Sequence, residues 1–138
     1  MDTLTGQRIK TIRITLGKTQ ADFADSINQR LDSDGTVTRG TVNNWEHGRN
    51  LPNKRRLKII ADLGGVSVDY LLHGSSITVS TIDSLAEKYK RGTITPDEKL
   101  LMNEASIDFR IETSNMVKAT KNTAEKLFNE TAYESFSP

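Results

Sequence analysis

Residues 38–46 read Thr-Arg-Gly-Thr-Val-Asn-Asn-Trp-Glu, and the rest of the fold can be worked out from this short segment. Thr38 is suited to cap a helix and Gly48 to end it, so a helix is predicted over about Arg39 to His47. Val42 and Trp45 lie three residues apart and share an apolar face. The other face carries short polar and basic positions, namely Arg39, Gly40, Thr41 and Asn44. This division is typical of a helix that is anchored by one face and contacts a ligand with the other.

Two amphipathic helices are predicted before this segment. The first runs from about Thr5 to Leu16 with Ile9, Ile12 and Leu16 on one face, and Gly17 ends it. The second begins after Thr19, which has Asp22 in a capping-box-like position. Its buried stripe comprises Phe23, Ala24, Ile27 and Leu31.

Two further helices follow the segment. One covers about Asn53 to Leu63, buries Leu57, Ile60 and Ala61, and ends at Gly64-Gly65. The other is a short helix over Val68 to Leu72 that Gly74 closes. No convincing strand pattern is found, so an all-α fold is predicted, with five helices in a first domain that spans residues 1–74.

The second half is predicted to be helical as well. Residues 75–78 are the best candidate for a linker, and a helix is expected from Ser80 to about Arg91. Thr95-Pro96 is a strong helix start, and no Gly or Pro occurs between Asp97 and Ser137. One long helix could therefore fill this span, with fraying after about Asn129 and disorder in the last ten or so residues.

The long helix carries more apolar surface than one contact requires. Met102, Phe109 and Met116 recur every seven residues, but Glu112 interrupts the pattern, so a regular coiled coil is not established. Because a lone helix is unstable in water, it must pack on the helix at residues 82–89, on a second subunit, or on both. We expect a homodimer formed through residues 79–128. A compact monomer, or a tail that orders only with another partner, is the alternative.

Composition excludes several classes of function. The chain of 138 residues has a net charge of +1, slightly basic in residues 1–74 and slightly acidic beyond, and it has no cysteine. His47 and His73 have no companions at metal-ligand spacing, so no metal site and no cofactor are expected. No nucleophile–base pair or nucleotide loop suggests an enzyme. No apolar run could span a bilayer and no signal peptide is visible, so a soluble, cytoplasmic protein without membrane contact is expected.

Taken together, these elements resemble the Xre/Cro family of phage and bacterial repressors over about residues 4–74. The matching positions are Arg8-Ile9-Lys10, Leu16-Gly17-Lys18-Thr19-Gln20, Phe23-Ala24, residues 41–52, Leu57, Ile60, Ala61 and residues 68–72. The resemblance implies a lambda-repressor-like domain of five helices that binds double-stranded operator DNA.

The resemblance also implies roles for individual residues. Base-reading positions would be Arg39, Gly40, Thr41 and Asn44, and side chains of these types suit guanine, adenine and the thymine methyl group. Phosphate-binding positions would be Gln20, Thr38, Asn43, Arg49, Asn50 and, from the basic run after Asn53, Lys54. Arg13 and Glu46 would form a salt bridge that locks the third helix, and Trp45 would be a core residue rather than a base-stacking one.

The sequence departs from the family at two places. Gly40 has no side chain with which to read a base, although it would allow the helix to approach DNA closely. The turn between the second and third helices, from Asn28 to Thr36, contains about eight extra residues. We expect the second helix to extend to Leu31, and Asp32 and Asp34 to point away from DNA because phosphates would repel them.

These observations lead to two functional hypotheses. The first is a dimeric repressor of a phage or mobile-element genetic switch in a bacterial host, which would need an antirepressor protein or another inducing route because no self-cleaving domain is present. The second is a protein-interaction regulator, such as an antitoxin or a peptide-sensing module, whose C-terminal helices bind a heterologous protein.

Overall fold

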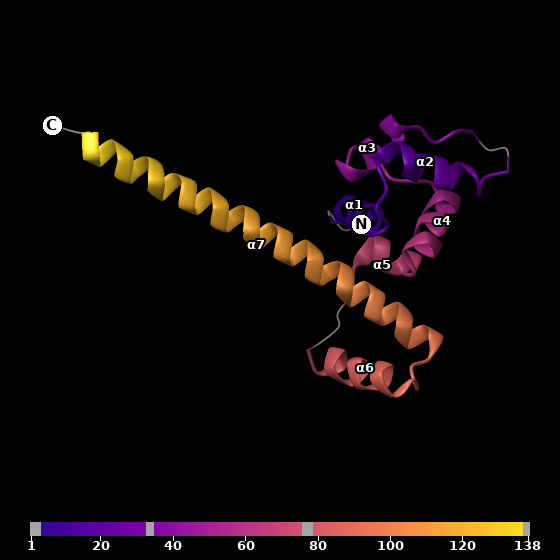
Figure 1. Cartoon of the computed structure of the whole chain (residues 1–138). Coiled ribbons are helices and arrows are strands. Elements are labelled where there is room, and N and C mark those ends of the chain that lie inside the picture. Colours follow the sequence, from indigo (N-terminus) through magenta and orange to yellow (C-terminus); the bar gives the residue numbers. More distant parts are fainter. Residues whose placement is uncertain (1–3, 33–34, 76–78, 137–138) are drawn as a thin grey trace.

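Seven α-helices make up the protein in the part of the chain that the computed structural model describes, residues 4–32, 35–75 and 79–136 (Figure 1). They are α1 (Thr5–Thr15), α2 (Gln20–Asn28), α3 (Arg39–Glu46), α4 (Lys54–Gly64), α5 (Val68–His73), α6 (Val79–Arg91) and α7 (Pro96–Phe136). The predicted all-α class, with five short helices followed by a helical C-terminal segment, is confirmed.

Side-chain caps fix where the short helices begin. Thr19, Thr38, Asn53 and Ser67 each adopt an extended backbone and accept a hydrogen bond from the backbone N–H three residues later. Each cap satisfies one of the N–H groups that a helix start leaves without an intrahelical partner. These local signals explain why the starts of α2, α3 and α5 could be predicted closely.

One apolar core unites α1 to α5. It includes Ile9 and Ile12 of α1, the α2 stripe, Val42 and Trp45 of α3, and apolar residues of α4 and α5. Gly6 lets α1 approach α3 closely, because a Cβ at this position would lie 2.6 Å from the carbonyl oxygen of Trp45. The α3 helix is therefore positioned directly against the backbone of α1.

Two expected boundaries in this region differ from the structure. Leu16 caps the C-terminus of α1 and is 39% exposed, so it does not continue the stripe of Ile9 and Ile12. The α2 helix ends at Asn28 rather than Leu31, because the Asn28 side chain is hydrogen-bonded to the backbone of the following loop. Leu31 nevertheless packs against the core from outside the helix.

The first part of α7 packs on the N-terminal helices. Ile107 and Ile111 are buried in the same core cluster as α1 to α5. Polar contacts reinforce this packing: Asn103 Nδ2 donates to the carbonyl oxygen of Gly65 at 2.8 Å, and Glu104 Oε1 accepts from Ser67 Oγ at 3.0 Å. The core thus continues across the division that we expected at residues 75–78.

The α6 helix forms a hairpin with the start of α7, which lies between α6 and the five-helix domain (Figure 1). Thr95 and Glu98 exchange hydrogen bonds as a capping box, and Lys88 donates to Glu98 at 2.5 Å. The Lys88 ammonium and the Thr95 contacts hold the pKa of Glu98 below its usual value. Leu85 of α6 is buried.

Beyond Lys118, which still lines a pocket with residues of α1 and α3, the α7 helix extends away from the rest of the protein (Figure 1). We call residues 112–129 the overhang, because every side chain in this range is exposed. The backbone stays helical to Phe136, past Asn129 where fraying was expected, as the absence of Gly and Pro allows. Among the described helices, none combines the length and apolar character needed to span a lipid bilayer.

Candidate nucleic-acid interface

The α3 helix has the two faces that its sequence predicts. Val42 and Trp45 are buried, and Trp45 is only 3% exposed, which makes it a core residue. Arg39 and Gly40 are exposed at the start of the helix. Asn44 is half-buried further along. Arg39, Gly40 and Asn44 therefore lie where a ligand can reach them.

Thr38 and Thr41 hold the start of α3 together. Thr41 N–H donates to Thr38 Oγ1 at 3.2 Å, and Thr38 N–H donates to Thr41 Oγ1 at 3.2 Å. The two hydroxyls are also 3.0 Å apart. This reciprocal capping box uses the Thr41 hydroxyl within the helix. Sequence reasoning missed this role, because a capping box usually has Glu or Gln at the third helical position.

A charged network locks α3 to α1. Arg13 Nε lies 2.6 Å from Glu46 Oε2, and Arg13 Nη2 donates to Glu46 Oε1 at 3.0 Å. The side chain of Glu46 is 1% exposed, and that of Arg13 is 13% exposed. Arg13 also donates to the carbonyl oxygen of Lys18 at 2.9 Å. A two-point contact of this kind fixes direction as well as distance.

Gln20 extends this network to α2. Its Nε2 group donates to Asn43 Oδ1 and to Glu46 Oε1, each at 3.2 Å. Gln20 and Asn43, which the family resemblance assigns to DNA phosphates, therefore lie in contact with each other. The amide of Gln20 braces the two helices directly, and the Asn43 oxygen is its acceptor.

The remaining expected contact residues lie along the segment that follows α3. Arg49 is exposed and donates to Asn44 Oδ1 at 3.1 Å, which links the expected phosphate-binding and base-reading positions. Asn50 is exposed in the loop, and Lys54 is exposed as the first residue of α4. The structure thus brings together three pairs, Thr38 with Thr41, Gln20 with Asn43, and Asn44 with Arg49.

Comparison with known families identifies this arrangement. Residues 9–71 match a family model described as Helix-turn-helix, the same region as α1 to α5. This domain belongs to the Xre/Cro helix-turn-helix family. The chain is therefore a DNA-binding transcriptional regulator. Comparisons with curated proteins and with solved structures gave no significant match.

The long turn of this helix-turn-helix is closed by one side chain. Asn28 Nδ2 donates to the carbonyl oxygen of Val37 at 2.8 Å, and Val37 N–H donates to Asn28 Oδ1 at 2.8 Å. Val37 is buried at 2% exposure. These two hydrogen bonds hold the last residue of α2 next to the residue that precedes the N-cap of α3.

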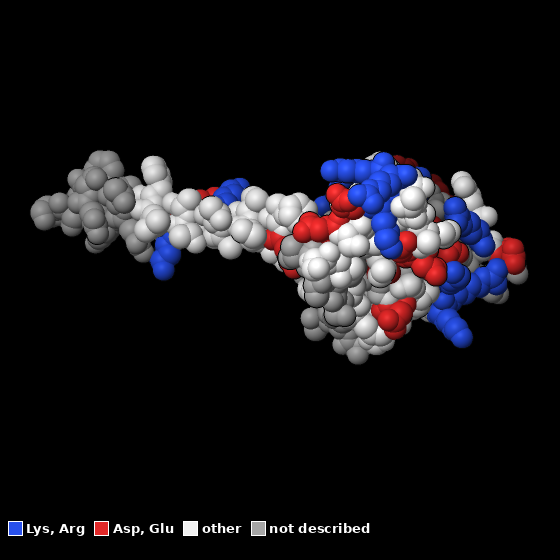
Figure 2. All heavy atoms as spheres, turned by 90° about the horizontal axis from the view of Figure 1, so that it is seen from below, with Lys and Arg blue, Asp and Glu red and all other residues white. Residues whose placement is uncertain are grey.

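The acidic residues of the turn were expected to point away from DNA. Asp32 is exposed and pairs with Arg55 of α4 at 2.8 Å, whereas Asp34 lies outside the described residues. Lys and Arg side chains gather at the globular end of the molecule and are sparse along the overhang (Figure 2). No group of three potential metal ligands occurs within the described part of the chain.

Proposed function

We propose that the protein is a sequence-specific repressor that binds operator DNA as a homodimer in a phage or mobile-element genetic switch, in the cytoplasm of a bacterial host. The observation that carries the proposal is the bracing of α3. Its exposed face is held by the partly buried Arg13–Glu46 pair and by Gln20, so few side chains remain to be ordered when DNA binds.

Base reading is assigned to the exposed face of α3. Arg39 can donate two hydrogen bonds to guanine, and Asn44 can pair with adenine through its amide. The Thr41 hydroxyl serves the capping box, so a contact from Thr41 would come from its methyl group on thymine. Gly40 contributes no side chain and permits close approach of the helix.

Phosphate binding is assigned to the residues around that face. They are Gln20, Thr38, Asn43, Arg49, Asn50 and Lys54. Because Asn43 uses its oxygen to accept from Gln20, its Nδ2 group is the part suited to donate to a phosphate. Thr38 lies at the N-terminus of α3, where backbone N–H groups favour an anion. Such contacts fix register and affinity rather than sequence.

Selection of bound sites from a random DNA library tests this function most directly. We expect two related half-sites at a fixed spacing of about one helical turn or a multiple of it. In gel shifts on the selected site, Arg39→Ala should cost about 1–3 kcal/mol and relax the preference at one base position. Gln20→Ala should weaken binding to all sequences alike.

The matched control is Lys90→Ala, which removes an exposed cation from α6, far from α3. It should leave binding unchanged. No enriched sequence in the selection, or equal effects of all three substitutions, would refute the assignment. A reporter that carries the selected site across its promoter separates repression from activation, and relief by an antirepressor can be sought in the same assay.

A second function is favoured by the overhang. Its exposed Met116, Val117, Leu127 and Phe128 could bind a heterologous protein, as in an antitoxin or a peptide-sensing regulator. Under this alternative the purified chain stays monomeric. Light scattering of the full chain distinguishes the two proposed functions, because a dimeric mass without any added partner favours the repressor.

A further inference from the structure

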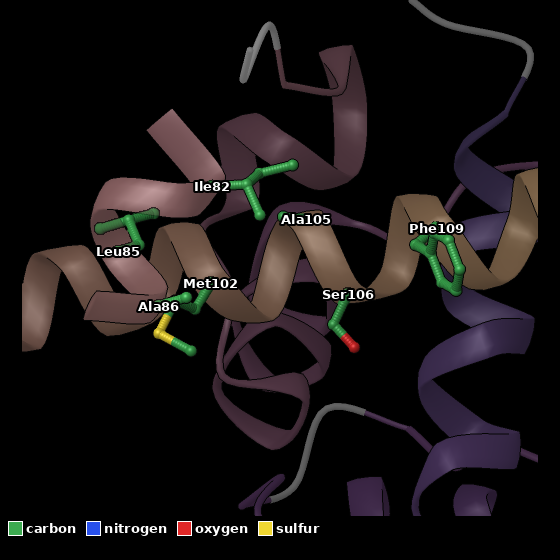
Figure 3. Close-up of a pocket in the computed structure, with 7 residues that line it drawn as sticks. All are labelled: Ile82, Leu85, Ala86, Met102, Ala105, Ser106 and Phe109. Atoms are coloured by element: carbon green, nitrogen blue, oxygen red, sulfur yellow. The ribbon is translucent and has the colours of Figure 1, made fainter. Parts of the chain in front are cut away.

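Two uncharged surfaces of the α6–α7 region lack a covering element among the described residues. The first is a groove of about 280 Å³ between α6 and α7 (Figure 3). Its lining is apolar except for Ser106 and comprises Ile82, Leu85, Ala86, Met102, Ala105, Ser106 and Phe109. Ile82 is 42% exposed and Phe109 is 69% exposed, so the α6–α7 hairpin covers only part of its own apolar surface.

The second surface is a stripe that runs from the groove along the overhang. It advances in alternating steps of four and three residues through Met102, Ser106, Phe109, Thr113, Met116, Thr120, Thr123 and Leu127. At 100° per residue these positions share one narrow face of α7, and none of them is charged. Glu112, which interrupts the simple seven-residue pattern, lies beside this stripe rather than on it.

The opposite face of α7 changes character at the start of the overhang. Up to Ile111 it packs on the core through Ile107 and Ile111. Beyond that point the same face carries Ser114, Lys118, Lys121, Asn122 and Glu125, all exposed. The overhang thus has one uncharged face and one face that carries charges, and Figure 2 shows it as a mostly uncharged surface when seen from the α6 side.

We propose that a second copy of the chain covers both surfaces, with the overhang of each copy lying antiparallel in the α6–α7 groove of the other. Each hairpin then becomes a three-helix bundle to which the partner supplies the third helix. The proposal specifies the contact within the homodimer proposed above and rests on that dimer.

The overhang cannot fill the groove of its own chain, because α7 is a continuous helix. The backbone is helical from Pro96 to Phe136, so the overhang points away from its own groove and cannot fold back into it. A second copy supplies a helix with a matching uncharged stripe. Each copy has one groove and one overhang, and a two-fold arrangement satisfies both at once.

The position of the grooves favours the antiparallel direction. When two such helices run in opposite directions, four-residue and three-residue steps interlock along the whole overlap of about seven turns. The facing pairs are Met102 with Leu127, Ser106 with Thr123, Phe109 with Thr120, and Thr113 with Met116. A parallel pair would instead set the two grooves and the two α6 helices against each other, and no helix would fill either groove.

Disulfide trapping tests the direction, because the chain has no cysteine of its own. Ser106→Cys and Thr123→Cys change exposed, small polar residues of the stripe. Under mild oxidation the mixture of the two variants should form a cross-linked dimer, and each variant alone should not. Ser114→Cys, on the opposite face, is the matched control for random collision.

The outcomes separate this proposal from the operator-binding function. Cross-linking of Thr123→Cys with itself would indicate a parallel pair and overturn the proposal, and so would the absence of any mixed cross-link. Leu127→Asp should convert the dimer to monomer in sedimentation, whereas Lys121→Glu on the other face should not. A chain that cross-links as expected but selects no DNA sequence would refute the proposed function and leave this inference standing.

Discussion

The hydroxyl of Tyr70 donates a hydrogen bond to Asp108 Oδ1 at 2.5 Å and joins the last helix of the DNA-binding domain to α7. Ser75 donates to the other oxygen of the same carboxylate at 3.1 Å. Tyr70 is 1% exposed, and the Arg8 guanidinium lies 5.4 Å from its ring centre. The stability of the helix-turn-helix is therefore coupled to a helix outside it.

Asp108→Ala should lower the free energy of unfolding by about 1–3 kcal/mol, because the buried Tyr70 hydroxyl loses its acceptor. Urea denaturation followed by circular dichroism measures the change. Glu112→Ala, an exposed carboxylate one turn further along α7, is the control and should change stability little. Equal stability of the two variants would show that the Tyr70 contact contributes nothing.

Stability should fall at alkaline pH because of Tyr70. Burial, followed by the hydrogen bond to Asp108, raises the pKa of this phenol well above its ordinary value of 10.0. The unfolded chain loses the proton from about pH 10 upward while the folded chain keeps it, so the contribution is complete below about pH 10 and declines above. The difference in the free energy of unfolding between the parent protein and Tyr70→Phe should therefore become smaller as the pH rises past 10. A constant gap would contradict this linkage.

Truncation should reveal that α7 belongs to the folded unit. Residues 1–74 lack Ile107 and Ile111, which are buried against the core, and should be less stable than the full chain by more than about 2 kcal/mol. Residues 1–112 keep these contacts and should retain the stability of the monomeric full chain. Leu127→Asp supplies that monomeric reference. Thermal denaturation compares the two fragments with the Leu127→Asp chain. If the fragment of residues 1–74 melted at the same temperature as that chain, α7 would have no role in stability.

Two glycines should respond oppositely to the same substitution. Gly6→Ala places a Cβ 2.6 Å from the Trp45 carbonyl oxygen, so it should displace α3 and weaken both folding and DNA binding. Gly40→Ala meets its nearest neighbour at 3.7 Å and should stabilise α3 by up to about 1 kcal/mol. If Gly40 allows close approach to DNA, the second variant will fold better and bind worse. Unchanged or tighter DNA binding by Gly40→Ala would show that Gly40 is not needed for close approach to DNA.

The local parts of the fold could be predicted from sequence because their signals are local. Caps such as Thr19 and Thr38 precede apolar positions at helical spacing, and the two faces of α3 follow from Val42 and Trp45. The docking of α7 could not be predicted in this way. Asn103, Glu104 and Asp108 look like solvated residues of a surface helix until their partners, which are distant in the sequence, are known.

The sequence names candidate site residues, but it does not show how they contact one another. Arg13 and Glu46 were expected to form a salt bridge and Gln20 to bind a phosphate. The sequence does not show that the Glu46 carboxylate accepts hydrogen bonds from both Arg13 and Gln20. The capping use of Thr41 was likewise hidden, because a threonine at that position is compatible with an outward-pointing hydroxyl. Such contacts depend on which rotamers the packed helices allow.

The pair of hydrogen bonds between Asn28 and Val37 has a consequence for how this DNA-binding module can change over time. Because these hydrogen bonds and the Gln20–Asn43 contact hold α2 against α3, the exposed residues between Leu31 and Val37 can be lengthened, shortened or replaced at little cost to the position of α3. The loop can therefore evolve separately from the residues that contact the operator, and it is the place where a tag or a new recognition element can be inserted.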